Sequence, residues 1–168
     1  MYQKSFFIIY SAVIIFLSGC GDQRTSNWSK LEFIQSQPVI EVYNINDTTH
    51  KHGDMHFFEA NLMDTTGKVV GQTIGYGMLV DIPGKDGMGF EEMDERMTTL
   101  IYRFNEKDAI MVQGGLIFNP GDTRIVMEKE NYRAIVGGTG KYIGARGQSI
   151  VTQKSDGNIQ IILELKQD

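Results

Sequence analysis

Three histidines, all that the chain has, lie close together at His50, His52 and His56, with Asp54 among them. Because alternate side chains of an extended backbone face the same side, this spacing can gather imidazole and carboxylate groups. Such groups bind zinc, copper or nickel. A short histidine-containing tract is also typical of a solvated polar loop, which is the interpretation we favour. We therefore predict no metal and no other cofactor, and retain His50, His52 and His56 only as secondary candidates for metal ligands.

Two further groups of charged residues were considered. The acidic segment 86–95 does not have the alternating Asp order of a calcium-binding loop, so we interpret it as solvated. Glu59 and Arg103 fall within predicted strands. A buried pair of this kind would be a candidate active centre, because buried charges need partners, but an exposed position is the default. No catalytic residue is predicted.

The single cysteine, Cys20, follows an N-terminal segment with the features of an export signal. Lys4 precedes an apolar run, residues 5–16, that is too short to span a bilayer comfortably. Leu17-Ser18-Gly19-Cys20 then resembles a bacterial lipobox. We expect residues 1–19 to be removed as a lipoprotein signal peptide and Cys20 to carry acyl chains such as palmitate, which together give stable membrane anchoring. An ordinary secretory signal, or an uncleaved anchor, is the alternative.

The expected location is the bacterial cell envelope. Cleavage removes Lys4 and no acidic residue, so the formal net charge changes from −5 to −6. An acidic chain without a basic run gives nucleic-acid binding no electrostatic support. Gly21 rather than aspartate follows the cysteine, and by resemblance to sorting in Gram-negative cells this favours the periplasmic face of the outer membrane.

Glycine is dense in residues 137–147, GGTGKYIGARG. A phosphate-binding loop would need Ser or Thr after Gly140-Lys141, where the chain has Tyr142, and a glycine where it has Ile135. The dinucleotide-binding spacing also fails, and no amphipathic helix follows. We interpret the stretch as a tight glycine corner between strands, in which the backbone takes positive φ or passes close to other backbone.

The elements that must position any site are β-strands. Alternating apolar residues and turn sequences predict strands over residues 39–45, 55–63, 68–80, 98–105, 109–118, 123–128 continued by 132–136, 148–154, and 159–165. Residues 81–97 are expected to form a loop. Residues 20–37 are polar and are expected to be a linker, although Trp28 could instead pack on the domain. Eight runs joined by short turns favour an all-β barrel over residues 38–168, because closure removes exposed edges.

The ordered set VYNIND, GKVVGQTIGYGMLV, IMVQGGLIF and YRAIVGGTG resembles the allene oxide cyclase and dirigent barrel superfamily over roughly residues 38–166. The resemblance implies an eight-stranded antiparallel, calycin-like barrel and, since members are often trimers, a homotrimer. It also implies a glutamate at Asn44, an asparagine at Asn46 and a cysteine at Gly77. Only Asn46 matches, so the resemblance does not carry cyclase activity over to this chain.

An eight-stranded barrel has room inside for one small ligand. Its candidate ligand-binding residues are Asn46, from the resemblance, and the apolar Tyr76, Met78, Tyr102 and Phe104. These side chains could equally fill a solid core. We predict a membrane-tethered lipoprotein whose barrel binds a small apolar or amphipathic ligand. The alternatives are an isomerase or stereochemical guide of the cyclase or dirigent type, and a non-catalytic structural or interaction lipoprotein.

Overall fold

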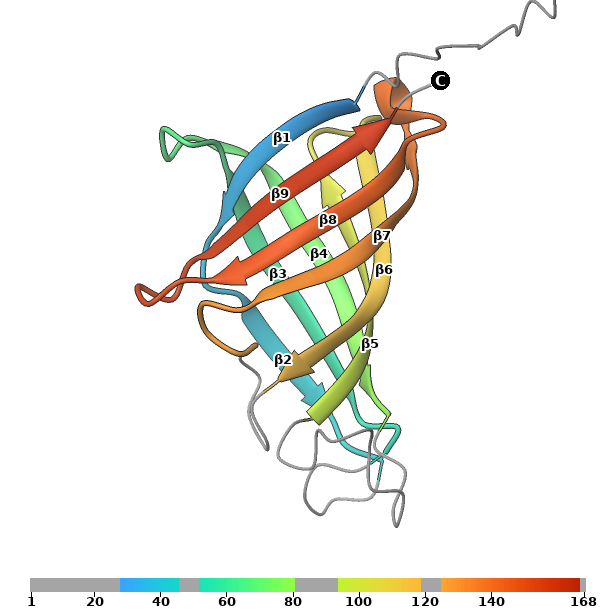
Figure 1. Cartoon of the computed structure of the whole chain (residues 1–168). Helices are drawn as coiled ribbons and strands as arrows, with labels where there is room; N and C mark the ends of the chain where they lie inside the picture. Colours follow the sequence, from blue (N-terminus) through green and yellow to red (C-terminus); the bar gives the residue numbers. More distant parts are fainter. Residues whose placement is uncertain (1–27, 46–51, 81–93, 119–124, 167–168) are drawn as a thin grey trace, which may run out of the picture.

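A computed structural model describes residues 28–45, 52–80, 94–118 and 125–166 (Figure 1). Its strands are β1 (Trp28–Gln35), β2 (Val39–Tyr43), β3 (Met55–Met63), β4 (Val69–Leu79), β5 (Asp94–Arg103), β6 (Ala109–Phe118), β7 (Glu130–Thr139), β8 (Arg146–Gln153) and β9 (Ile159–Lys166). A short 3-10 helix, η1 (Gly140–Tyr142), joins β7 to β8. Within these ranges no helix has the length and apolar character needed to cross a bilayer.

The strands form one antiparallel sheet that closes on itself, in the order β1-β9-β8-β7-β6-β5-β4-β3-β2 with β1 also pairing with β3. In that closing pair Ile34 lies opposite Met63 and Gln35 opposite Leu62. Strand β2 continues along β3 where β1 leaves it, so β1 and β2 together fill one position of the barrel. The predicted eight-stranded antiparallel barrel is confirmed.

Strand β1 is a correction to the sequence analysis, which assigned residues 28–35 to the linker. Leu31 and Phe33 point inward against the core and pair with Leu163 and Ile161 of β9. The intervening Lys30 and Glu32 face outward and form an ion pair of 2.7 Å. Because only two large apolar residues alternate with charges, the segment is too polar overall to be recognised as a barrel strand. Residues 20–27 lie outside the described residues.

Two other boundaries also differ from the prediction. Strand β5 begins at Asp94, so the end of the predicted loop 81–97 is a barrel strand. Residues 125–128 do not form the first part of a strand. Met127 instead makes an isolated parallel bridge to Gln153, and β7 runs unbroken from Glu130 to Thr139. The polar residues that face inward at the start of β5 and β7 explain why hydrophobic alternation placed these boundaries wrongly.

The glycine-rich stretch 137–147 forms the predicted tight corner, with η1 at its centre. Gly140 has a φ of +59°, and a side chain there would overlap Asp108 in the turn between β5 and β6. Oδ1 of Asp108 accepts a hydrogen bond of 3.1 Å from the backbone N–H of Lys141. Glycine therefore lets the corner sit directly on that turn and close this end of the barrel.

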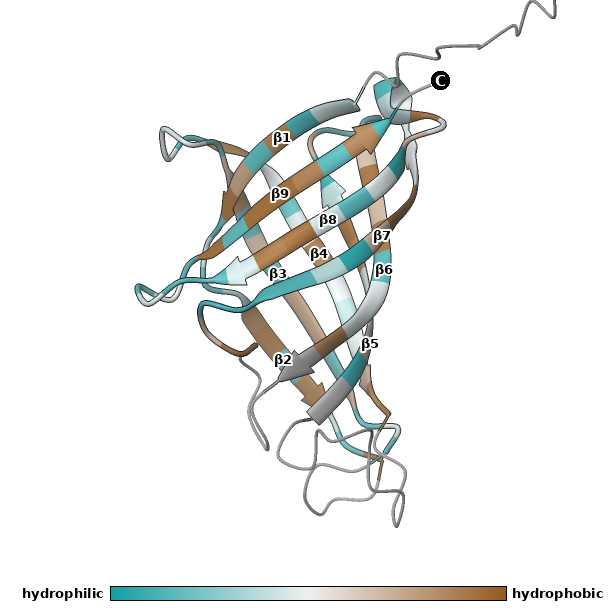
Figure 2. Ribbon diagram, in the orientation of Figure 1, coloured by the Kyte–Doolittle hydropathy of each residue, from teal (hydrophilic) through white to brown (hydrophobic). Residues whose placement is uncertain are grey.

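The barrel interior is filled at the end next to η1. The rings of Phe33, Phe104 and Tyr142 stack in sequence, with centroids 5.4 Å and 5.1 Å apart. Fully buried Leu62, Ile110, Ile161, Leu163 and Leu165 complete this packing. Apolar and polar residues alternate along the strands, which is the pattern of a sheet with one face inward (Figure 2). The remaining interior space lies toward the opposite end.

Candidate functional site

A cavity of about 550 Å³ occupies the barrel interior beyond the filled end. Known small-molecule pockets measure about 300–1,000 Å³ and are mostly apolar with a few polar groups. The walls here follow that composition. Apolar lining residues are Ile40, Phe58, Leu100, Leu116, Ile125, Met127, Val151 and Ile159, and the polar lining includes His56, Arg96, Thr98, Tyr102 and Arg133. The cavity has the size and lining expected of a ligand site.

Cross-strand register brings the polar residues into one band. His56 of β3 lies opposite Gly77 of β4, which lies opposite Thr98 of β5. Thr98 in turn lies opposite Gly114 of β6. Residues that lie opposite each other in antiparallel strands face the same side of the sheet. We call the resulting set of inward residues the polar belt; its members are His56, Arg96, Thr98, Tyr102, Arg133 and Ser149.

The two glycines in this band make room for the belt. A Cβ atom at Gly114 would lie 3.2 Å from Cα of Arg133 and 3.3 Å from its Cβ, so a larger residue would push Arg133 aside. At Gly77 a Cβ atom would lie 3.2 Å from Cγ2 of Thr98 and would extend toward the cavity. The absence of side chains at these positions leaves space for both the arginine and a ligand.

Hydrogen bonds orient the belt. Arg133 Nε donates to Thr98 Oγ1 at 2.9 Å, and the same hydroxyl donates to the Gly114 carbonyl at 3.0 Å. Thr98 thus uses its donor and an acceptor to hold the arginine. Arg96 Nη1 lies 3.1 Å from His56 Nδ1, and since a guanidinium can only donate, this imidazole nitrogen is the acceptor. The hydroxyls of Tyr102 and Ser149 are 3.4 Å apart.

The belt is cationic and shielded from solvent. Arg96 is 1% exposed and Arg133 is 6% exposed. Burial lowers the pKa of the Arg133 guanidinium, but a guanidinium remains protonated in proteins. Burial also raises the pKa of the Tyr102 hydroxyl, and the Arg133 charge beside it opposes that shift. Tyr102 is therefore neutral near pH 7, and of the described residues that line the cavity none is acidic.

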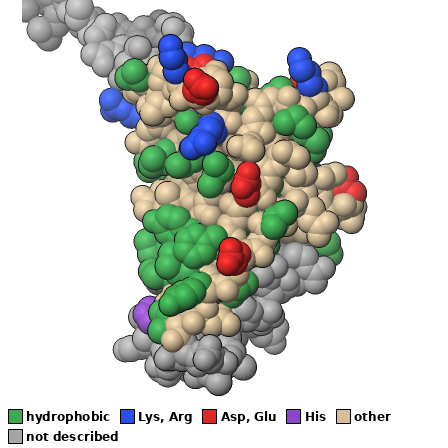
Figure 3. Space-filling view, turned by 180° about the vertical axis from the view of Figure 1, so that it is seen from behind, with side chains coloured by type: hydrophobic (Ala, Val, Ile, Leu, Met, Phe, Trp, Pro, Cys, Tyr) green, Lys and Arg blue, Asp and Glu red, His purple; other side chains and the backbone are tan. Residues whose placement is uncertain are grey.

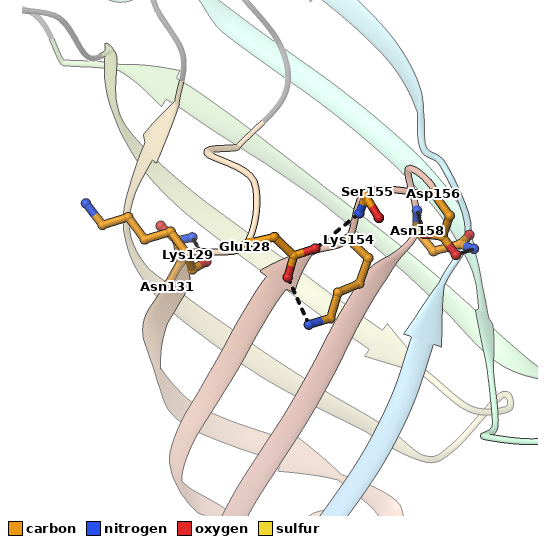
Figure 4. Close-up of polar contacts among 7 residues, drawn as sticks. All are labelled: Glu128, Lys129, Asn131, Lys154, Ser155, Asp156 and Asn158. Atoms are coloured by element: carbon orange, nitrogen blue, oxygen red, sulfur yellow. Dashed lines mark hydrogen bonds and ion pairs between the residues drawn. The ribbon is translucent and has the colours of Figure 1, made fainter.

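The segment 125–128 is fastened to the turn between β8 and β9 at the cavity rim (Figure 4). Glu128 Oε2 lies 3.3 Å from Lys154 Nζ, and Glu128 Oε1 accepts a hydrogen bond of 3.2 Å from the backbone N–H of Ser155. Its own N–H donates to the Gln153 carbonyl at 2.9 Å. These bonds hold Glu128 at a φ of +55° and keep Ile125 and Met127 in the cavity wall.

The predicted ligand-binding residues divide between several places. Tyr102 lines the cavity, whereas Phe104 belongs to the filled end. The prediction that Tyr76 and Met78 line the interior is wrong: Tyr76 is 41% exposed, and Met78 has the same outward orientation. Strand β4 turns its small residues, among them Gly75 and Gly77, inward because side chains from the neighbouring strands occupy that space. Asn46 lies outside the described residues, and Asn44 is exposed.

The charged residues singled out in the sequence also separate. His52 is exposed in a turn, His56 is buried in the polar belt, and His50 lies outside the described residues. In the described part of the chain, no group of three or more His, Cys, Asp or Glu side chains could hold a metal ion. Glu59 and Arg103 are exposed, as the default interpretation had it. Cys20 and most of the acidic segment 86–95 fall outside the described residues.

Sequence reasoning missed Arg96 and Arg133, the two residues that set the charge of the site. A signal for Arg96 existed, because Arg96, Thr98, Leu100 and Tyr102 alternate and all face inward. In β7 the hydrophobic signal is reversed: Tyr132 and Val136 are about half exposed, while Arg133 is buried between them. Choosing the more apolar face as the inward one therefore hides Arg133.

The sequence matches no family model and no curated protein. The structure is similar to that of a pyocyanin demethylase, with a TM-score of 0.62 and 18% identity over 82% of this chain and 99% of that one. It is also similar to a nonspecific heme-binding cyclase that catalyses a [4 + 2] cycloaddition (TM-score 0.63, 15% identity), covering 84% of this chain and 65% of that one. A pterocarpan synthase dirigent protein gives a TM-score of 0.53 at 17% identity, with 83% of each chain covered.

At these identities the similarity establishes the fold. The chain has a dirigent-like and cycloaddition-catalyst-like β-barrel, which agrees with the superfamily resemblance of its sequence. Function has to be argued from the site, because one fold carries many activities.

Proposed function

We propose that this protein binds a small amphipathic molecule inside the barrel without altering it. The observation that supports this most directly is the cavity of about 550 Å³, which combines apolar walls with a buried polar belt. A solid interior would have favoured a structural role, and the cavity argues against that alternative. Proteins of similar fold also handle small molecules, among them a heme-binding cyclase.

Native mass spectrometry of the full chain, extracted in mild detergent, tests the proposal. We expect the protein to retain one small molecule per chain, or to take up one equivalent of the neutral dye N-phenylnaphthylamine when it is isolated empty. Denatured protein serves as the control for non-specific uptake. A chain that carries nothing and does not bind the dye saturably would overturn the proposal.

A second candidate function is a catalyst of ring closure or isomerisation. Its specific support is the buried Tyr102 hydroxyl and the Arg96–His56 pair at the cavity, groups that can hold a substrate and stabilise developing charge. Cyclases of similar fold exist. Allene oxide cyclase activity is not proposed, because Asn44 and Gly77 lack the groups that the resemblance implies. Recovery of a bound molecule chemically different from the one supplied would favour catalysis over binding.

We also propose that Cys20 is acylated and that the barrel is tethered to the periplasmic face of the outer membrane. The Cys20→Ser variant should be soluble in the periplasm, because removing the thiol removes the site of every acyl chain. The measurement is incorporation of labelled palmitate together with fractionation of inner and outer membranes. Membrane association that survives in Cys20→Ser would show that another segment anchors the chain.

Self-association as a homotrimer is proposed through the outer face of β2 to β6. Tyr43, Phe57, Tyr76, Met97 and Met111 are each more than 40% exposed on this face. A cluster of green apolar side chains is visible on the side of the molecule shown in Figure 3. Exposed apolar surface of this kind often marks an interface between proteins. The same native mass spectra would report the mass of three chains, and a monomer alone would contradict the proposal.

A further inference from the structure

The inference concerns the charge of the ligand, and it rests on the proposed binding function. Arg133 from β7 and Arg96 from β5 both line the cavity, and Lys154 stands at its rim. The protein as a whole is acidic, with a formal net charge of −5. A cationic interior in an acidic protein is costly to build, because a buried charge loses its hydration unless a partner compensates for it.

Arg133 is the clearest case. Its Nε donates to the Thr98 hydroxyl, and the neighbouring Tyr102 hydroxyl is neutral. Among the described residues, no carboxylate forms an ion pair with Arg133, and no described residue of the cavity lining is acidic. The guanidinium has five N–H donors, so the bond to Thr98 leaves donors for another group. Thr98 and Gly114 fix this arginine in place, and it therefore offers a preformed anion-binding group.

We infer that the ligand carries one anionic group, such as a carboxylate, sulfonate or phosphate, which sits against Arg133 in the polar belt. The planar fork of a guanidinium matches these groups and forms charge-assisted hydrogen bonds with them. Arg96, held at 3.1 Å from His56, adds a second positive charge to the same belt. The apolar body of the ligand lies among the wall residues, which include Leu116, Ile125 and Val151.

Two dyes that differ in one group test this inference. Anilinonaphthalene sulfonate carries a sulfonate, and N-phenylnaphthylamine has the same ring system without it. Fluorescence titrations give both dissociation constants for the wild type, Arg133→Gln and Arg133→Lys. Arg103→Gln is the matched control, because Arg103 lies on the outer surface. Circular dichroism and thermal unfolding confirm that each variant is folded.

We expect Arg133→Gln to weaken binding of the sulfonate dye by at least about tenfold and to leave the neutral dye within about twofold, because only the charge-assisted bonds are lost. Arg133→Lys should restore part of the affinity for the sulfonate, and Arg103→Gln should change neither constant. Equal loss of both dyes, or no loss of either, would overturn the inference while leaving the binding function intact. Failure of the wild type to bind either dye would instead overturn the binding function itself.

If Arg133→Gln does not fold, the wild type alone still decides. Decanoate and decanol share an alkyl chain and differ in charge. We expect decanoate to displace the neutral dye at a concentration at least about tenfold lower than decanol does. Displacement at equal concentrations would contradict an anion site in the cavity.

Discussion

The Gly147→Ala variant is expected to unfold with a free energy about 3 kcal/mol smaller than that of the wild type. Gly147 lies in β8 with a φ of +144°, a conformation that L-residues rarely adopt. A Cβ atom there would overlap the carbonyl oxygen of Glu164 and lie 3.1 Å from Cα of Leu165. Because both obstacles are backbone of the neighbouring strand β9, they cannot move without breaking the pairing of the two strands. Chemical denaturation followed by circular dichroism measures the change.

Gly144→Ala is the matched control for this prediction. Gly144 belongs to the same glycine corner and has a φ of +79°, but a Cβ atom there meets nothing within 4 Å. The alanine should therefore cost only the backbone strain, about 1 kcal/mol. Equal destabilisation in the two variants would mean that strain alone, and not the close approach of β8 to β9, makes glycine necessary at Gly147.

The Gly77→Leu variant is expected to bind N-phenylnaphthylamine at least about tenfold more weakly, a loss of ~1.4 kcal/mol or more in binding free energy. Gly77 lines the cavity, and a side chain there starts 3.2 Å from Cγ2 of Thr98. The isobutyl group therefore extends into space that the dye would occupy. The fold should be retained, since the cavity accepts the added group. Fluorescence titration and thermal unfolding give the two quantities.

Gly115→Leu is the corresponding control on the outside of the barrel. Gly115 is an exposed strand glycine of β6, and a Cβ atom there has no neighbour within 4 Å. The same substitution should leave dye binding unchanged. Undiminished binding by Gly77→Leu, with its fold intact, would show that the dye binds elsewhere, for example on the apolar outer face.

The polar belt illustrates why the candidate site was only partly predictable. Tyr102 was identified because it lies on the apolar face of a strand, which happens to point inward. Tyr76 was assigned inward by the same rule and is exposed, since β4 turns its glycines toward the interior. Alternation divides a strand into two faces but does not say which face is inward when both carry apolar residues. In β4 and β7 that choice depends on the neighbouring strands.

The sequence by itself determined the all-β class, the glycine corner at residues 137–147 and most strand positions. These follow from interactions between residues close in the chain: turn chemistry, positive φ at glycine and the two-residue period of a strand. Only the tertiary structure decided that Trp28–Gln35 closes the barrel, that Gly77 and Gly114 leave a cavity, and that Arg133 meets Thr98 inside it. Those features depend on register and on the summed volume of side chains from many strands, and neither is encoded in any one segment.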